Sequence, residues 1–503
     1  MTPKMTRLVV QDDRMGIDPD RGRADRLSGA IWGHLIGDAV GVPYEFGPPV
    51  PAATVVFGKS GTHGRPPGTW SDDGAMTLAL IDSLMTVGFD PVDQGIRYLA
   101  WSDDGAYTPE GEGRFDIGNA TAVALGRIRG GIPAEEAGGD ETTLGNGSLM
   151  RTLPIALVGH DLAPVDLVGW ASRASAVTHA SAVARMTCGF YTLIAVDLLR
   201  GRRDRSAALR DSTATLRSLV VGAERAALEQ ILAWPTRAGR GHVIDAFWSA
   251  WDAFEGADSY RDTIARAVAY GRDTDTTACI AGGLAGSYWG FDGIPHEWQS
   301  RLRDRLQVAA ATDRLLAPHG WRTSSSHPLR LDTVDLLDVP GLAATTGMVG
   351  MTFLPGKRRD GWMGPWWRDL DEDGDALRST HGVDALLILV EDHELESCGV
   401  PDIALRLPRD HGVQVLRHPI VDMGIPTDPL AFRAVLADLL ARIEAGQTVA
   451  IACRGGLGRT GTAVACLLVM AGLAPDAAID LTRRSRHGTI ERNEQEAFVR
   501  AWT

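Results

Sequence analysis

The sequence lacks the features that mark a secreted or membrane protein. Its five cysteines are scattered and none forms a Cys-x-x-Cys pair, which disfavours both a disulfide framework and a zinc ribbon. Residues 1–25 are polar and charged and contain no apolar signal-peptide core. The longest apolar run, Thr462–Leu473, is too short to cross a bilayer. We therefore expect a cytoplasmic protein with no membrane partner.

Lysine is also scarce, since among the 50 basic residues only Lys4, Lys59 and Lys357 are not arginine. We attribute this bias to a GC-rich genome rather than to function. Asp and Glu number 64, giving a formal net charge of −14 that argues against non-specific nucleic-acid binding, which needs a basic face. The 44% hydrophobic and 23% charged residues are typical of folded protein and exclude wholesale disorder.

The chain divides into parts of different texture. We predict a flexible N-terminus over 1–25 and an all-α domain over 26–316, where helical spacing recurs at 77–85 and 181–199 and strand patterns are scarce. Residues 317–334 contain Pro, Gly, His and three consecutive serines and predict a linker. Apolar runs at 383–390, 413–420 and 448–452, with a helical segment at 429–445, predict a parallel-rich α/β domain over 335–503.

The most specific motif lies between the apolar run 448–452 and an apolar helix predicted over 462–472. It reads Cys453-Arg454-Gly455-Gly456-Leu457-Gly458-Arg459-Thr460. A glycine-rich loop at a helix N-terminus points several backbone N–H groups into one concavity, which binds anions and favours the thiolate form of a cysteine at its base. The planar guanidinium of Arg459 can return to the same place and bind two phosphate oxygens.

This loop resembles the active site of cysteine-dependent dual-specificity and tyrosine phosphatases, especially the kinase-associated phosphatase type. His418–Gly424 is similar to that group's general-acid loop, and the resemblance covers about residues 335–503. It implies that Cys453 attacks phosphorus, that Asp422 protonates the leaving oxygen and then activates water, and that Arg459 holds the phosphoryl group. Thr460 would stabilise the departing thiolate. The other loop residues would bind phosphate, and no cofactor is implied: Arg454, Gly455, Gly456, Leu457 and Gly458.

One departure from that family is visible immediately before the cysteine. The family usually has a histidine there, which supports the thiolate from outside the loop, and this chain has Ala452. We therefore expect weaker support for the thiolate from outside the loop than in that family.

Two acidic clusters open predicted helices in the N-terminal part. Ser71-Asp72-Asp73 is the first, and Asp273-Thr274-Asp275-Thr276 follows about two hundred residues later. Carboxylates and hydroxyls are the all-oxygen ligands that suit Mg²⁺ or Mn²⁺, and two such clusters would naturally share a two-metal site. Each cluster by itself is also typical of a helix N-cap, so the residues alone leave both interpretations open.

The surrounding segments resemble the ADP-ribosylglycohydrolases, the all-α family that includes the dinitrogenase-reductase-activating glycohydrolase. Gly29–Glu45 is similar to that family's opening helix, and Phe115–Asn119, Gly145–Arg151 and Thr178–Ser181 follow in its order. The resemblance covers roughly residues 26–315. It implies a centre of two Mg²⁺ or Mn²⁺ ions with these ligands: Ser71, Asp72, Asp73, Asp273, Asp275 and Thr276.

The same resemblance implies roles for the remaining segments. Glu45 is the best candidate for the catalytic carboxylate and Asp116 the second. The turn Asn146-Gly147-Ser148 suits a pyrophosphate, because small residues let backbone N–H groups approach it. His179 would lie against the nucleotide, and the alternative for it is a satisfied core histidine. A second Trp-Ser-Asp-Asp-Gly at 101–105 precedes no apolar helix and is not assigned to metal.

The sequence thus predicts a bifunctional hydrolase. Its N-terminal domain would remove ADP-ribose from a modified acceptor, and its C-terminal domain would hydrolyse phosphate monoesters through a cysteinyl-phosphate. The expected partners are ADP-ribosylated and phosphorylated substrates, either protein or small molecule. The alternative is a regulatory or binding protein in which one of the two sites is degenerate.

Overall fold

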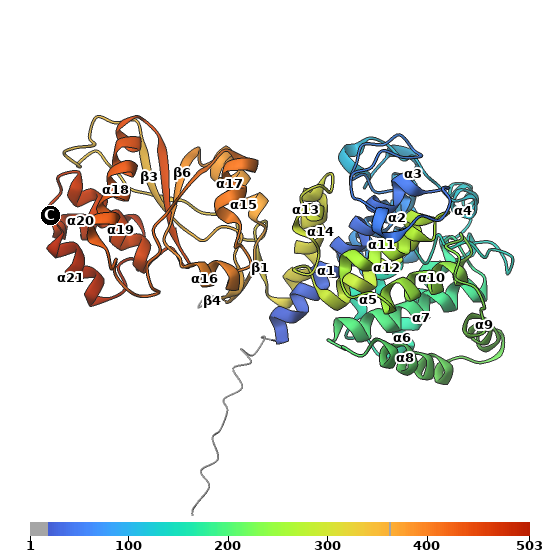
Figure 1. Cartoon of the computed structure of the whole chain (residues 1–503). Coiled ribbons are helices and arrows are strands. Elements are labelled where there is room, and N and C mark those ends of the chain that lie inside the picture. The colour runs from blue at the N-terminus through green and yellow to red at the C-terminus, as the bar shows by residue number, and fades with distance from the viewer. Residues whose placement is uncertain (1–18, 362–363, 503) are drawn as a thin grey trace, which may run out of the picture.

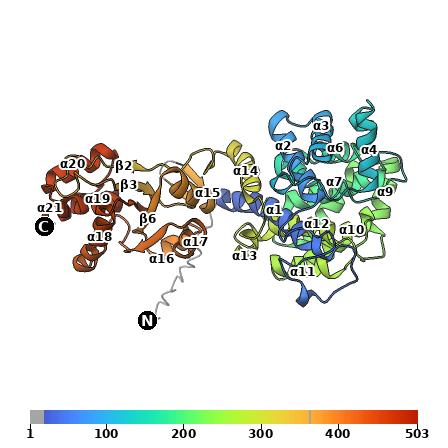
Figure 2. The same cartoon turned by 90° about the horizontal axis from the view of Figure 1, so that it is seen from above.

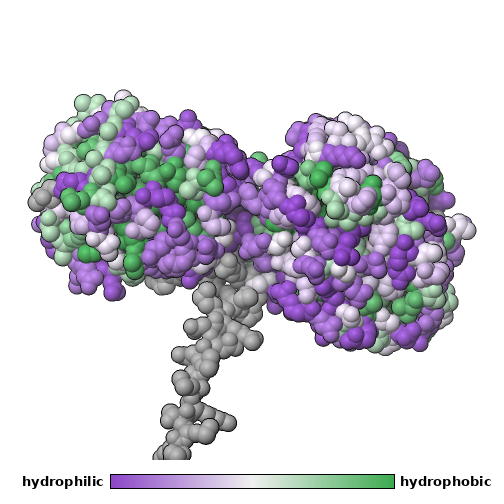
Figure 3. All heavy atoms as spheres, viewed as in Figure 1, coloured by the Kyte–Doolittle hydropathy of each residue, from purple (hydrophilic) through white to green (hydrophobic). Residues whose placement is uncertain are grey.

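The computed structural model describes residues 19–361 and 364–502 and contains two bodies. One is built of helices and the other is an α/β body, and they lie side by side with the elements of residues 296–323 at their junction (Figures 1 and 2). The predicted combination of an all-α N-terminal domain and an α/β C-terminal domain is confirmed. Hydrophilic residues cover much of the visible surface of both bodies (Figure 3).

The helical body begins earlier than the sequence indicated. Helix α1 starts at Pro19, so residues 19–25 are helical rather than flexible, and 1–18 lie outside the described residues. The helices that follow are α2 (Asp72–Val87), α3 (Pro91–Asp104), α4 (Asn119–Arg129), α5 (Leu153–Gly159), α6 (Pro164–Ala176), α7 (Ala182–Leu199), α8 (Arg205–Leu219), α9 (Gly222–Leu232), α10 (Val243–Glu255), α11 (Tyr260–Ala269), α12 (Thr274–Trp289), α13 (His296–Gln299) and α14 (Arg305–Leu316).

Helices α1 (Pro19–Gly41) and α12 pack against each other unusually closely. Glycine recurs at every fourth position of α1, and a Cβ on Gly37 would lie 2.2 Å from the Ala278 carbonyl oxygen. A Cβ on Gly41 would lie 2.4 Å from the Cα of Asp275. Only glycine permits this approach, which brings the C-terminal end of α1 directly against the acidic N-terminal turn of α12.

Helix α7 is long and apolar enough to cross a membrane by length and composition alone. In the structure 89% of it is buried inside the protein. It packs against α6, α8, α9 and α10, and its side chains belong to the hydrophobic core of the helical body. This is the environment expected of a central core helix.

The α/β body has a five-stranded sheet in the order β2-β3-β8-β6-β7. Its strands are β2 (Asp332–Thr333), β3 (Met348–Phe353), β6 (Val383–Ile388), β7 (Gln414–Arg417) and β8 (Thr448–Cys453). All neighbouring pairs are parallel except β2 with β3. The accompanying helices are α15 (Leu370–Asp375), α16 (Asp392–Ser397), α17 (Ile403–His411), α18 (Pro429–Glu444), α19 (Gly458–Met470), α20 (Pro475–Ser485) and α21 (Asn493–Ala501).

The segment 317–334, which the sequence indicated as a linker, is built into the contact between the two bodies. Strand β1 (Arg322–Thr323) pairs with β5 (Gly364–Trp367), which forms a hairpin with β4 (Arg358–Gly361). Trp367 is buried and makes edge contacts with Phe291 and with Trp321. Arg358 forms an ion pair of 3.1 Å with Asp292. Cutting the chain here would expose apolar surface on both sides, so the two sites are better separated by point variants.

Candidate active sites

The acidic clusters occupy the N-terminal turns of two neighbouring helices. Ser71 caps α2 and its hydroxyl accepts from the Asp73 N–H, so Asp72 and Asp73 stand in the first turn. Asp273 precedes α12, and Asp275 and Thr276 follow in its first turn. The preceding residue, Arg272, has φ 63°, a conformation that is uncommon for a residue with a side chain and is frequent at functional sites.

The two clusters meet in space although about two hundred residues separate them. The Thr276 hydroxyl donates to Asp73 Oδ2 at 3.3 Å. Carboxylate oxygens of Glu45, Asp273 and Asp275 lie within 4.8 Å of one another. Oxygen atoms at this separation can share one divalent cation or bridge a pair of them.

The electrostatics of the cluster fit a cation. Burial raises the pKa of Asp73 well above its ordinary value, and the carboxylates of Asp38 and Asp72 raise it further. Burial, Asp116 and Asp273 together raise the pKa of Glu45 to about 9. Asp73 Oδ1 is buried and has no hydrogen-bond partner among the described residues. An orphaned carboxylate oxygen among like charges is costly unless a metal ion takes it as a ligand.

These residues line a cavity of about 980 Å³. The predicted site residues in its wall are Glu45, Asp72, Asp73, Asp116, Asn146, Gly147, His179, Asp273, Asp275 and Thr276. Two predicted residues are not in the wall. The Ser71 hydroxyl is occupied by Asp73, and Ser148 turns into the core, where it bonds with Ser175 and contacts Cys188. Both exposed aspartates of the second Trp-Ser-Asp-Asp-Gly lie outside the cavity wall.

His179 forms the floor beneath the glycine turn. A Cβ on Gly147 would lie 2.9 Å from its Cε1 atom, so the turn needs glycine there. Its Nδ1 lies 2.8 Å from the Thr178 hydroxyl. Burial, with a smaller effect of Arg151, lowers the pKa of His179 to about 3. The imidazole is therefore neutral at physiological pH and contributes no positive charge to the cavity.

Two residues of this site were not assigned from the sequence. His63 contacts Glu45, and these two residues form with Asp116 a second group of side chains that could hold a metal ion. Asp38, buried in α1, accepts from the N–H groups of Ser71 at 3.0 Å and Gly74 at 2.8 Å. The sequence shows Asp38 as a charged residue within an apolar helix, which could have marked it as functional. Nothing in the sequence indicates that it contacts α2.

Asp38 is expected to position the metal-binding turn rather than to bind substrate. Asp38→Ala would leave two buried N–H groups without an acceptor and let the turn that carries Asp72 and Asp73 move. We expect a loss of about 10–100-fold in Mn²⁺ affinity, the range typical of residues that orient metal ligands. Equilibrium dialysis of the purified variant measures this, and an unchanged affinity would contradict the role.

The second site lies where β8 ends and α19 begins. Cys453 is 4% exposed, and the Gly456 N–H donates to its Sγ at 3.3 Å. Gly456 has φ 73°, and a Cβ there would lie 2.4 Å from the Thr352 carbonyl oxygen, so glycine is needed to form the loop. The residues 454–457 form this loop and Gly458 is the first residue of α19.

Arg459 returns to this loop and is held by two carboxylates. Its guanidinium bonds with both Glu394 oxygens, at 2.6 and 2.9 Å, and with Asp422 Oδ1 at 2.8 Å. Asp422 Oδ2 also lies 2.8 Å from Arg454. Burial opposes the ionisation of Glu394, but the bonds from Arg459 outweigh it and lower the pKa of Glu394. Cys453, Arg459 and Asp422 are thus brought together as the sequence led us to expect.

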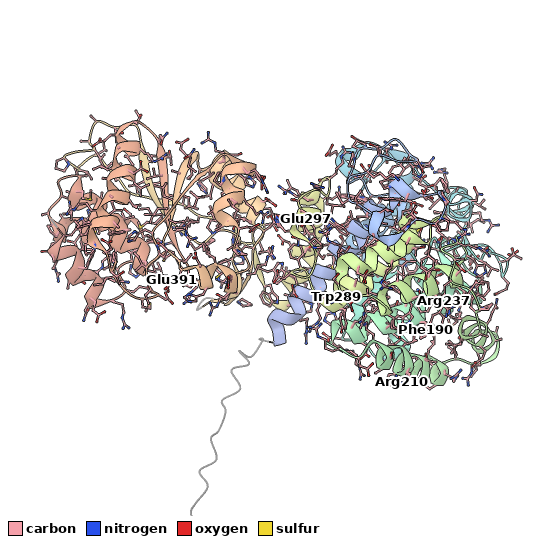
Figure 4. All side chains as sticks on the ribbon, in the orientation of Figure 1. Phe190, Arg210, Arg237, Trp289, Glu297 and Glu391 are labelled. Carbon is pink, nitrogen blue, oxygen red and sulfur yellow. The ribbon has the colours of Figure 1, made fainter. Side chains whose placement is uncertain are left out.

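Glu394 was not predicted, although an acidic loop was evident after β6. In a parallel sheet the carboxyl ends of neighbouring strands share one edge, so a residue after β6 lies beside the end of β8. Figure 4 labels Glu391, which caps α16 in a capping box with Glu394. The Thr460 hydroxyl is buried and has no hydrogen-bond partner among the described residues.

Comparison with known proteins agrees with both sites. Residues 19–324 match the ADP-ribosylglycohydrolase family, and residues 372–499 match the "Swiss Army Knife protein, DSP-PTPase phosphatase domain". ADP-ribosylarginine hydrolase Tri1 of Pseudomonas putida (strain GB-1) is 32% identical over 291 residues, covering 55% of this chain and 74% of the relative. ADP-ribosyl-[dinitrogen reductase] glycohydrolase of Rhodospirillum rubrum is 28% identical, covering 59% of this chain and 97% of the relative.

Two solved structures are also similar to parts of the chain. A structure titled "ADP-ribosylglycohydrolase-related protein complex" aligns with a TM-score of 0.51 at 32% identity, covering 59% of this chain and 99% of that one. A structure of kinase associated phosphatase aligns with a TM-score of 0.31 at 26% identity, covering 34% of this chain and 92% of that one.

The fold and the two sites therefore define a chain that joins two hydrolase-type domains. It belongs to the ADP-ribosylglycohydrolase family, with a C-terminal domain of the dual-specificity and tyrosine phosphatase type. The glycohydrolase family is generally metal-dependent, and the buried acidic cluster of this chain is of the corresponding chemical type.

Proposed function

We propose that the protein is a bifunctional hydrolase of the cytoplasm. The N-terminal domain releases ADP-ribose from a modified acceptor with the aid of two Mg²⁺ or Mn²⁺ ions, and the C-terminal domain hydrolyses phosphate monoesters. The observation that carries the first activity is the meeting of the two acidic turns, with Thr276 bonded to Asp73 and one Asp73 oxygen left without a partner.

In the glycohydrolase reaction the bond from ribose C1″ to the acceptor breaks while water adds to C1″. The transition state resembles an oxocarbenium ion, which nearby carboxylates stabilise. Glu45, or Asp116 as the second candidate, takes a proton from the water, and a proton passes to the leaving acceptor. A cation among the carboxylates would lower the raised pKa of Glu45 and favour the ionised form that this step needs. Asp72, Asp73, Asp273, Asp275 and the Thr276 hydroxyl would hold the metal ions, which would orient the ribose hydroxyls and polarise the water. Asn146, Gly147 and His179 hold the ADP part.

In the phosphatase reaction Cys453 attacks phosphorus, and the phosphorus–oxygen bond to the leaving group breaks. Asp422 gives that oxygen its proton and then takes one from the water that hydrolyses the cysteinyl-phosphate. Arg459 and the loop N–H groups hold the phosphoryl oxygens. The short bonds between Arg459 and Glu394 support this role, because they fix the guanidinium plane beside the loop.

The proposal is tested on the full-length protein with two substrates. A protein ADP-ribosylated on arginine is the first choice for release of ADP-ribose because that is the linkage named for the Pseudomonas putida relative, and a serine-linked substrate is the alternative. An aryl phosphate serves for the second site. Chelation is expected to stop ADP-ribose release, Mg²⁺ or Mn²⁺ to restore it, and neither to change aryl phosphate hydrolysis. Full ADP-ribose release in chelator would refute the metal-dependent mechanism.

A further inference from the structure

A buried lysine lies behind the phosphate-binding loop. Lys357 is 7% exposed and follows β3, whose last residue, Phe353, pairs with Cys453 in the sheet. Its Nζ donates to the Arg454 carbonyl oxygen at 3.2 Å, one residue beyond the cysteine. The ammonium also lies over the rings of Phe353 and Trp366, at 4.6 and 4.5 Å from their centroids.

No carboxylate among the described residues lies within 4.0 Å of this ammonium. Asp373 raises the pKa of Lys357 from a distance, but its carboxylate already accepts hydrogen bonds from Arg368 Nε and Nη2 and from the Ser324 hydroxyl. A buried cation that contacts one carbonyl oxygen and two ring faces is poorly compensated, so it would stabilise an anion that forms nearby.

The backbone that presents Lys357 is itself fixed. The Gly356 N–H donates to Asp373 Oδ2 at 2.7 Å, and Gly356 has φ 69°. A Cβ on Gly356 would lie 2.7 Å from the Cβ of Leu370, so the turn admits only glycine. The ion pair between Arg368 and Asp373 therefore holds the turn that directs the lysine at the loop.

We propose that Lys357 is a positioning residue. Its ammonium group, held in place by the turn, stabilises the Cys453 thiolate, and its bond to the Arg454 carbonyl keeps the loop N–H groups directed inward. The histidine that is usual before the cysteine is replaced by Ala452, which is buried and carries no charge. Lys357 supplies, from the turn after the neighbouring strand β3, the support that the histidine gives to the thiolate in that family. The expected effect of Lys357 on phosphate turnover rests on the proposed phosphatase function, whereas its effect on the thiolate does not.

Several other charges face the same loop. Arg454 and Arg459 act in the same direction as Lys357, and Glu394 and Asp422 act against it. Burial, reinforced by Arg368, lowers the pKa of Lys357 to about 8, against the opposing effect of the Cys398 and Cys453 thiols. The lysine is thus protonated below about pH 8 and neutral above it, so its support of the thiolate is present at low pH and is lost as the pH rises.

The test measures the thiolate directly in the full-length protein. Alkylation of Cys453 by iodoacetamide is followed by mass spectrometry between pH 5 and 10 at about half-unit steps. We expect Lys357→Met to move the midpoint of the rate profile up by about one pH unit, with an about tenfold lower rate at pH 6, since one unit is a tenfold change in thiolate. The difference from wild type should vanish above pH 8, where the wild-type lysine is neutral.

Two further variants separate charge from packing. Lys357→Gln keeps a donor for the Arg454 carbonyl without the charge and is expected to shift the profile as Met does. Lys357→Arg keeps the charge and is expected to restore most of the wild-type profile. The matched control is Lys59→Met, which removes an exposed lysine that lies 4.3 Å over the Tyr44 ring in the other body and should change nothing.

A folded Lys357→Gln or Lys357→Met protein with an unshifted alkylation profile would overturn the inference, even if its phosphatase activity fell. Thermal unfolding shows which variants are folded. Lys357→Gln and Lys357→Met give two independent chances of obtaining a folded variant without the charge. Failure of the proposed phosphatase function is a different result. In that case the wild-type thiol would alkylate with the expected lysine dependence, yet no phosphate monoester would be hydrolysed.

Discussion

Asp73→Asn is expected to abolish metal binding in the N-terminal domain and to reduce ADP-ribose release by more than about 100-fold, the most that a residue acting only through a ligand usually contributes. The Asn side chain has the same shape and keeps an acceptor for the Ser71 and Thr276 hydroxyls. It replaces the one buried carboxylate oxygen that has no partner among the described residues. The loss should therefore come from the missing ligand rather than from a disturbed fold.

Thermal unfolding gives a second readout of the same variant. Asp73 lies among carboxylates that raise its pKa, so Asn removes a like charge from the cluster. In chelator the variant is expected to be at least as stable as the wild type. Mn²⁺ should raise the unfolding temperature of the wild type only, because a ligand stabilises the state that binds it.

The chain itself offers a matched control for this experiment. Asp104 occupies the same position as Asp73 in the second copy of Trp-Ser-Asp-Asp-Gly, but it is exposed at the end of α3. Asp104→Asn should leave metal binding and ADP-ribose release unchanged. Equal losses in both variants, or Mn²⁺ binding retained in Asp73→Asn, would remove the metal site from the proposal.

Local patterns predicted much of each site, because each motif combines a helix start with its functional residues. The Ser71–Asp73 turn and the Cys453–Thr460 loop are read directly from such segments. Residues that support them come from elsewhere in the chain. Asp38 reaches α2 from α1, and Glu394 and Lys357 approach the loop after neighbouring strands. Their partners depend on strand order and helix packing, which a single sequence does not specify.

The same limit explains the segment between the bodies. Pro, Gly and Ser are typical of linkers, and residues 317–334 have that composition. The structure instead pairs β1 with β5 and buries Trp367 against both Phe291 and Trp321. These contacts join residues that are 44 to 76 positions apart, so composition alone gave no signal for them.

This junction lies at one end of α12 and the acidic cluster at the other. Phe291 follows the last residue of α12, Trp289 (labelled in Figure 4), whereas Asp273 and Asp275 lie at its beginning. A 16-residue helix spans about 24 Å at 1.5 Å per residue. The two candidate sites are therefore separate and share no residue, so a lesion in one is expected to leave the proposed activity of the other intact.

Cys453→Ser is accordingly expected to eliminate aryl phosphate hydrolysis and to leave ADP-ribose release at the wild-type rate. A serine hydroxyl is almost fully protonated at neutral pH, whereas the proposed mechanism needs a thiolate, so the variant would lack the nucleophile and keep the loop N–H groups. The matched control is Cys466→Ala, which removes a buried thiol from α19 of the same body, outside the loop. Both activities are measured on each full-length variant, together with phosphate binding to Cys453→Ser by calorimetry.

Residual phosphate hydrolysis above about 1% in Cys453→Ser would assign the nucleophile to another residue, because a covalent mechanism cannot proceed without it. A parallel fall in ADP-ribose release would instead reveal coupling between the two bodies through the Trp367 junction.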